Sequence, residues 1–288
     1  MKNLITAALL LIGLGTSGTS AQDKALLYKV TGPGLDKPSY LYGTFHLVCP
    51  DDLRITDALK NAIGDAQQVY LELDMDDPAL MGQMMKSVMM TDGKTLKTLL
   101  KPEEYELLDG YLKKTMNTGL APFNTMKPLY LMSLLYTTLL PCQPQPYDVV
   151  FAQMAANDKK EVRGLESLEA EMAALDKIPL REQLSALVDM ARKPDEAKKE
   201  FTALLDAYKA HDLTKLMQLT KDSQFSGGDF SQFEDSLLGE RNANWIPVIE
   251  KAAKEKPTFF AFGAGHLGTG KGIINLLRQK GYTVTPIQ

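Results

Sequence analysis

Cysteine, histidine and tryptophan are scarce in this sequence, with 2, 3 and 1 copies among 288 residues. Two cysteines exclude a cysteine-rich zinc scaffold, which needs clustered thiolate ligands. An excess of one charge is also missing, because 32 Lys and Arg face 36 Asp and Glu, a formal net charge of −4. A mildly acidic chain lacks the basic footprint for nucleic acid or anionic membranes. We therefore expect no nucleic acid as a partner, and the composition leaves the oligomeric state open.

What the sequence does contain is the composition of a globular protein. Hydrophobic residues make up 44% and charged residues 24%, which excludes a disordered or collagen-like chain. The length of 288 residues is typical of one large domain or two small ones.

The first 21 residues have the pattern of a secretory signal peptide. Lys2 is followed by an apolar stretch over 5–14 and then by small residues up to Ala21. An apolar core of about ten residues is half of the ~20 that a membrane span requires. The pattern predicts cleavage after Ala21, a mature chain of 22–288 without a stable membrane span, and a periplasmic or extracellular location.

Export changes what the two cysteines imply. Cys49 and Cys142 form an even pair in an oxidising compartment, which favours a disulfide between them. Two free, buried thiols are the alternative.

Hydrophobic periodicity predicts strands at both ends of the mature chain and helices between them. β-favouring segments occupy 25–30, 39–44, 68–74, 161–165, 257–262 and 282–287. A large helical insertion is expected over about 78–157, and further helices over 168–255. The pattern predicts a single α/β domain with a mixed central sheet formed by the N- and C-terminal strands.

Two of the three histidines share one context. Gly43-Thr44-Phe45-His46 and Gly263-Ala264-Gly265-His266 are both Gly-x-x-His segments that follow a predicted strand. Ligand sites of open α/β sheets form beyond the carboxyl ends of the strands. His211 instead lies in a polar junction between predicted helices, where a surface or capping role is expected.

A carboxylate in the sheet completes a possible metal site. Glu72 interrupts an otherwise apolar strand, and strand periodicity places Asp74 on the same face as a second choice. Two imidazoles and a carboxylate can hold a divalent metal with one position open, and the carboxylate can instead act as general base. The alternative for each residue is structural: a hydrogen-bonded histidine at a strand end, or a salt-bridged acid.

The glycines near the C-terminus resemble nucleotide-binding motifs but do not complete them. Residues 263–268 match G-x-G-x-x-G, yet only 20 residues follow, too few for the acidic ribose partner. Residues 265–271 begin like a P-loop, but Gly272 stands where Ser or Thr is needed. What remains is a helix start near Lys271 that can hold an anionic group of a substrate.

Methionines recur on one face of the first predicted helix of the insertion. Met81, Met84, Met85, Val88 and Met89 follow helical spacing. We expect this stripe to face the core; a docking face or a soft-metal site is the alternative.

Several segments together resemble one family. They are Leu41-Tyr42-Gly43-Thr44-Phe45-His46, Leu71-Glu72, Gly164-Leu165-Glu166-Ser167 with the acidic helix after it, Leu238-Gly239-Glu240-Arg241-Asn242, and Phe262-Gly263-Ala264-Gly265-His266-Leu267. In this order they resemble the TraB/PrgY/GumN family over about residues 26–288. The resemblance implies a fold like the erythromycin esterase/ChaN group. Its animal TIKI branch comprises metal-dependent proteases with two Gly-x-x-His motifs and an acidic residue between them.

Carried over to this chain, the resemblance points to a metal site and its neighbours. It implies His46, Glu72 and His266 as metal ligands, with manganese, cobalt or zinc as the ion. Arg241 would pair with a carboxylate or a substrate anion and stabilise charge, and Glu166 and Asn242 are further motif positions. Cys49 lies outside the family pattern.

The resulting hypothesis is an exported metal-dependent hydrolase that acts on a small-molecule or peptide substrate. Peptide bonds are the favoured substrate, Glu72 and Arg241 are the candidate catalytic residues, and Glu166, Asn242 and Lys271 are candidates for binding substrate. One alternative is a non-catalytic protein that binds a peptide, sugar or haem-like ligand in the same place. Another is an interaction protein that docks through the methionine-rich helix.

Overall fold

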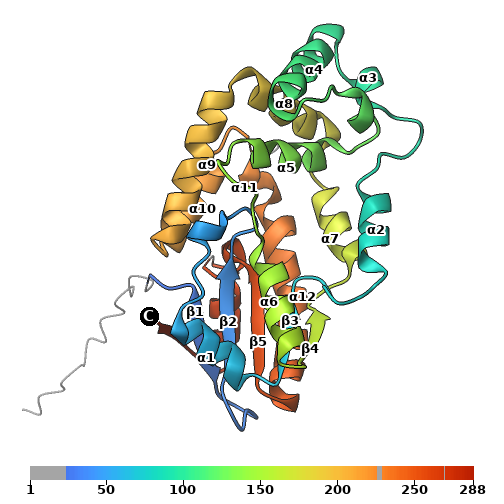
Figure 1. Cartoon of the computed structure of the whole chain (residues 1–288). Coiled ribbons are helices and arrows are strands. Elements are labelled where there is room, and N and C mark those ends of the chain that lie inside the picture. The colour runs from blue at the N-terminus through green and yellow to red at the C-terminus, as the bar shows by residue number, and fades with distance from the viewer. Residues whose placement is uncertain (1–23, 226–228, 269) are drawn as a thin grey trace, which may run out of the picture.

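A computed structural model describes residues 24–225, 229–268 and 270–288 (Figure 1). The predicted signal peptide, residues 1–21, lies outside the described residues. The chain forms a six-stranded sheet from β1 (Leu27–Thr31), β2 (Ser39–Thr44), β3 (Gln68–Leu71), β4 (Glu161–Gly164), β5 (Thr258–Gly263) and β6 (Thr283–Ile287). No helix in these ranges is long and apolar enough to cross a membrane.

The sheet is mixed and joins the two ends of the chain. Its order is β4-β3-β5-β2-β1-β6. β4, β3, β5 and β2 run parallel, whereas β1 pairs antiparallel with both β2 and β6. The predicted single α/β domain with a mixed sheet of N- and C-terminal strands is confirmed. Because four neighbouring strands are parallel, their carboxyl ends meet at one edge of the sheet.

Helices fill the long connections. α1 (Asp57–Asp65) follows β2. Between β3 and β4 lie α2 (Leu80–Ser87), α3 (Leu96–Leu99), α4 (Pro102–Met116), α5 (Pro128–Thr138) and α6 (Tyr147–Asn157). Between β4 and β5 lie α7 (Leu168–Leu175), α8 (Leu180–Arg192), α9 (Pro194–Lys209), α10 (Leu213–Asp222), α11 (Phe230–Glu234) and α12 (Glu240–Glu255). α13 (Ile273–Gln279) precedes β6.

α6 and α12 cover opposite faces of the sheet. Phe151 of α6 packs edge-on against Phe259, while Trp245 of α12 packs against Phe262. Residues 259 and 262 of one strand point to opposite faces because side chains alternate along a strand. The main hydrophobic cluster is therefore a sheet buried between helices.

A second hydrophobic cluster is purely helical. It is built mainly from α3, α4, α5, α8 and α9, which in Figure 1 gather beyond the carboxyl ends of the parallel strands. Phe45 packs against both clusters, and its ring lies 6.0 Å from Phe201 and 5.2 Å from Tyr208 between centroids. The residue next to His46 thus joins the sheet layer to the helical layer.

Two expectations from the sequence are wrong in detail. Met81 and Met85 are 69% and 61% exposed, and Met89 is exposed too, so this side of the stripe does not face the core. α2 buries only Leu80 fully, because this short helix packs mainly against α7. In addition β3 ends at Leu71, so Glu72 follows the strand instead of lying within it.

Gly43 allows the two Gly-x-x-His segments to approach each other. A Cβ at Gly43 would lie 2.5 Å from Leu267 Cδ1 and 3.1 Å from the Ala264 Cα. The second contact is with backbone, which cannot rotate away. The loop that carries His266 therefore lies directly on the strand that leads to His46.

We predict that Gly43→Ala lowers the free energy of unfolding by about 1–3 kcal/mol, because the added methyl overpacks this contact. Urea unfolding monitored by circular dichroism measures the change. Gly110→Ala is the matched control, since open space surrounds that helical position and alanine favours the helix there. Equal stability of the Gly43→Ala variant and the original protein would contradict the close approach.

Candidate active site at the carboxyl edge of the sheet

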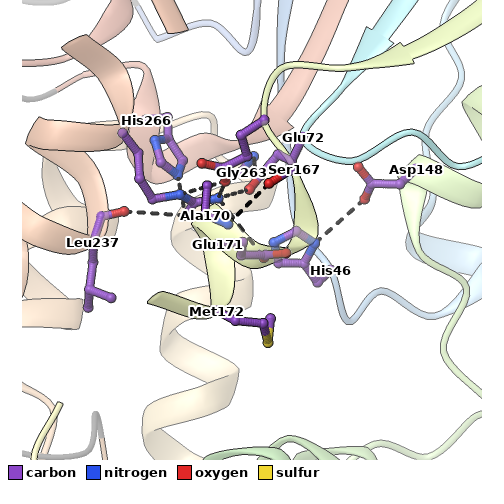
Figure 2. A network of polar contacts seen from close by, with 12 residues as sticks. His46, Glu72, Asp148, Ser167, Ala170, Glu171, Met172, Leu237, Gly263 and His266 are labelled. Carbon is purple, nitrogen blue, oxygen red and sulfur yellow. Dashed lines mark hydrogen bonds and ion pairs between the residues drawn. The ribbon is translucent and has the colours of Figure 1, made fainter. Parts of the chain in front are cut away.

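Each of the four parallel strands delivers one predicted site residue just beyond its end. His46 follows β2, Glu72 follows β3, Glu166 follows β4 and His266 follows β5. The parallel order of these strands places their ends side by side, so residues distant in sequence meet at one edge (Figure 2).

Arg241, in the first turn of α12, links these residues. Its side chain is 11% exposed. Its Nη2 donates to Glu72 Oε2 at 2.6 Å, and its Nε donates to Glu166 Oε1 at 2.8 Å. Nη1 donates to the carbonyl of Leu237 at 3.3 Å, in the π-helical turn Asp235–Gly239 before α12, and Glu171 Oε1 lies 4.0 Å from Nη2. One buried cation thus holds two carboxylates and faces a third.

Glu72 is buried and ionised. Its Oε1 accepts a hydrogen bond from the backbone N–H of Gly263 at 2.7 Å. Burial favours the neutral acid, but the electrostatic attraction of His266, Arg241 and His46, with the Gly263 N–H, lowers its pKa to about 2. Glu72 therefore carries a negative charge throughout the physiological range.

His266 is buried with a defined tautomer. Asn242 donates its amide N–H to the Lys271 carbonyl at 2.9 Å, which leaves its Oδ1 to accept from His266 Nδ1 at 2.6 Å. The Nε2 lone pair of His266 accepts a hydrogen bond from Arg241 Nη1 at 3.3 Å. The ring stacks on Trp245 at 4.4 Å between centroids. Burial, together with Arg241 and His46, outweighs the attraction of Glu72 and lowers the pKa of His266 to about 3.

His46 has the opposite surroundings. Its side chain is 63% exposed, and its Nδ1 lies 3.5 Å from Asp148 Oδ2 on α6. Loss of water around the ring acts to lower its pKa, but the contact with Asp148 and the charges of Glu72, Asp148 and Glu171 raise it to about 9. Two histidines of one site therefore differ in charge at neutral pH.

The three predicted metal ligands surround one glycine. A Cβ on Gly263 would lie 3.3 Å from Glu72 Oε1, 3.6 Å from His46 Nε2 and 3.8 Å from His266 Cδ2. The hydroxyl of Thr44 is buried without a hydrogen-bond partner in the described part of the chain, and Thr44 is in register with Gly263 in the neighbouring strand. Because residue 263 has no side chain, all three groups can approach the same backbone position.

Two site residues have no individual signal in the sequence. Asp148 lies in the first turn of α6, and only the fold brings it to His46. Glu171 lies on α7, in the acidic helix that belongs to the family resemblance. Burial, with repulsion from Glu72 and Glu166, raises the pKa of Glu171 to about 7 against the attraction of Arg241.

Lys271 and Asp74 are not part of the cluster. The Lys271 ammonium pairs with Asp235 at 2.6 Å and is exposed, at the rim of a cavity of about 320 Å³ that Leu238 and Gly239 also line. Its backbone carbonyl, not its charge, serves the site by binding Asn242. Asp74 lies beyond the turn after β3, and its Oδ1 has no partner among the described residues.

The cysteine pairing is confirmed. Cys49 and Cys142 form a disulfide, with a Cα–Cα distance of 5.8 Å. It links the loop after His46 to the segment before α6.

The fold and site define an α/β protein with a buried polar centre at the carboxyl edge of its sheet. The sequence profile of the TraB/PrgY/gumN family matches residues 26–286, so the chain belongs to that family. No solved structure matches the chain.

Two curated relatives are named as metalloproteases. Metalloprotease TIKI2 of Xenopus tropicalis is 26% identical over 302 residues, covering 86% of this chain and 57% of that protein. Metalloprotease TIKI1 of Danio rerio is 24% identical over 303 residues, covering 86% of this chain and 61% of that protein. An uncharacterized protein of Treponema pallidum (strain Nichols) is 23% identical over 275 residues, which cover 88% of this chain and 80% of that protein. The chain spans about three fifths of the length of these TIKI proteins.

A divalent metal fits the donors of this site in chemical kind, but not in the arrangement that they have here. Both histidines have Nδ1 held by an oxygen, as metal-ligating histidines do, and Glu72 is ionised. Over the described ranges no three His, Cys, Asp or Glu residues are arranged to hold an ion. Because Arg241 takes the Nε2 lone pair of His266, a metal-bound form requires His266 to exchange this hydrogen bond for the metal.

We predict that the imidazoles titrate far apart in the metal-free protein. His266 stays neutral down to about pH 3, whereas His46 stays protonated up to about pH 9. Because the pKa of His266 is lower in the folded state, its contribution to stability is complete above about pH 6.5 and is lost as the pH falls toward 3. For His46 the sign is reversed, and its contribution is lost as the pH rises from 6.5 toward 9.

Proton NMR of the three imidazole Cε1–H signals measures these titrations. The His46→Gln and His266→Gln variants identify which signal belongs to which histidine. Titration of both His46 and His266 near pH 6.5 would contradict the electrostatics described for the site.

Proposed function

We propose that this chain is an exported metal-dependent hydrolase whose favoured substrates are peptides. The observation that carries the proposal is the convergence of His46 Nε2, Glu72 Oε1 and His266 around the α-carbon of Gly263. Membership of a family whose relatives include proteins named metalloproteases supports it. The metal and the substrate class are proposals for this chain.

His46, Glu72 and His266 would hold the metal, which we propose to be manganese, cobalt or zinc. When bound, such an ion lowers the pKa of a coordinated water and makes it a nucleophile near neutral pH. Asn242 fixes the Nδ1–H tautomer of His266, so that Nε2 is the ligating nitrogen. Glu72, kept ionised by its neighbours, serves as ligand or as general base.

The other residues of the site stabilise charge or bind a proton. Arg241 holds Glu72 and Glu166 in place and offers the positive charge nearest to a developing oxyanion. Glu171, with a pKa of about 7, is able to hold or release a proton on its carboxyl group at working pH. Glu166 and Asn242 act mainly through Arg241 and His266. Lys271 would have to leave Asp235 before it could contact an anionic substrate group.

Two further features belong to this proposal. We infer that the chain is exported after cleavage of residues 1–21, into the periplasm or outside the cell, and the Cys49–Cys142 disulfide supports an oxidising location. We also infer a kinship of fold with the erythromycin esterase/ChaN group, which the parallel strands and the helical layer over their carboxyl ends support.

One observation favours a second function. The bond from Arg241 to His266 Nε2 gives the site an internal cation without a metal. The rival is therefore a protein that binds a peptide, sugar or haem-like ligand at the same place without hydrolysing it.

We expect residues 22–288, purified without chelator or histidine tag, to contain about one equivalent of divalent metal by mass spectrometry. The His46→Ala/His266→Ala variant should lose it and still unfold cooperatively, because neither ring is a main part of a hydrophobic cluster. His211→Ala is the matched control and should keep the metal, since His211 lies outside the cluster. Absence of metal from the unaltered chain, even after reloading with manganese, cobalt and zinc, would refute the metal-dependent function.

A further inference from the structure

We propose that Asp148 is the positioning residue of His46 and that the Cys49–Cys142 disulfide holds the two in alignment. The effect on metal binding rests on the proposed function; the effect on the His46 ring does not.

The largely buried side chain of Asp148 is paired with His46. Its side chain is only 12% exposed, and its Oδ2 lies 3.5 Å from His46 Nδ1. His46 is the one side chain within the described ranges that the structure pairs with it. A carboxylate removed from water is costly unless it is paired, so the ion pair fixes where the imidazole ring lies. Figure 2 shows this contact between His46 and Asp148, with Asp148 at the edge of the group of labelled residues.

The consequence of this contact is the direction of the other ring nitrogen. With Nδ1 held by Asp148, Nε2 of His46 is directed toward Gly263 and lies 3.6 Å from the position that a Cβ would take there. Asn242 does the same for His266 by holding its Nδ1. Both histidines are thus oriented through Nδ1 by an oxygen from a helix, and an oxygen partner of this kind sets the tautomer and direction of a ligating imidazole.

The loop that carries His46 is attached to the start of α6 by three bonds. Cys49 is joined to Cys142 by the disulfide. The Gln145 N–H donates to the Val48 carbonyl at 2.8 Å. The Arg54 N–H donates to the Tyr147 hydroxyl at 3.1 Å. All three join residues 48–54 to residues 142–147, which flank His46 on one side and Asp148 on the other.

Of these three bonds only the disulfide is covalent. It therefore determines how closely residues 48–54 are held to residues 142–147. The two hydrogen bonds and the buried Val48 and Tyr147 side chains remain when it is absent, so the fold persists. The segments then gain freedom to slide by fractions of an ångström, which is enough to weaken an ion pair at 3.5 Å. The redox state of two cysteines outside the polar cluster therefore acts on His46 through Asp148.

The experiment compares the original chain with Asp148→Asn, Cys49→Ser/Cys142→Ser and the triple variant. Asp52→Asn is the matched control, because Asp52 lies in the same loop but pairs with Lys209. The first readout is the NMR signals of the His46 ring in metal-free protein. We expect Asp148→Asn and the disulfide variant to shift the His46 signals, while Asp52→Asn leaves them in place and His266 does not respond.

The second readout is the affinity for Co²⁺, followed by its visible absorption. Asp148→Asn should weaken binding about 10–100-fold, the range found when an outer partner of a ligating histidine is removed. The disulfide variant should weaken it in the same direction, and the triple variant should lose little more than Asp148→Asn, because both changes act on one contact. Asp148→Glu should restore part of the affinity.

The outcomes separate this inference from the proposed function. An unaltered chain that binds no Co²⁺ refutes the proposed function, and the His46 signals still decide the positioning. Unchanged His46 signals in Asp148→Asn overturn the role of Asp148. Full additivity in the triple variant, or loss of cooperative unfolding when the disulfide of the unaltered chain is reduced, overturns the role of the disulfide and makes it structural only.

Discussion

The site depends on one buried cation. Arg241 bonds to Glu72 and Glu166, faces Glu171 and donates to His266, and so binds together segments that follow β3, β4 and β5. Three carboxylates within a protein interior repel one another and are costly to remove from water. Without a positive charge between them, the carboxyl edge of this sheet would have to open to solvent or take up protons. The guanidinium group, which offers donors in several directions at once, suits this position better than an ammonium group.

The arrangement explains how a site is built from residues far apart in sequence. Four parallel strands end at one edge, each followed by a polar residue, and α12 inserts Arg241 between them. The second hydrophobic cluster lies beyond the same edge and joins the sheet layer through Phe45. His46 is more exposed than Glu72, Arg241 and Glu171 and lies between this buried centre and the surface. A substrate would therefore meet His46 first, with Glu72 and His266 behind it.

Part of this was predictable from the sequence, and the reasons are specific. The strands that contain 39–44 and 258–262 read clearly because aromatic and β-branched residues cluster there, and the paired Gly-x-x-His segments marked their ends. The contact of Asp148 with His46 was not predictable, because an acid in the first turn of a helix is ordinary capping chemistry. The prediction that the methionine stripe faces the core was wrong on one side of the stripe, because periodicity defines a helical face but not whether another element covers it. The ion pair of Lys271 with Asp235 was likewise not predictable, because only the fold brings these two residues together.

The free energy of unfolding of Arg241→Met, measured with urea between pH 7 and pH 4.5, tests the central role of this cation most directly. We predict a loss of about 3–5 kcal/mol at pH 7, because a buried charge cluster loses its counter-ion. Lowering the pH should then stabilise the variant, since Glu72 and Glu171 bind protons more readily in its folded state than in its unfolded state. Arg163→Met, which removes an exposed arginine paired with Glu161, should change the free energy of unfolding little. An Arg241→Met variant with a loss as small as that of Arg163→Met, and with the pH dependence of the unaltered protein, would contradict the account.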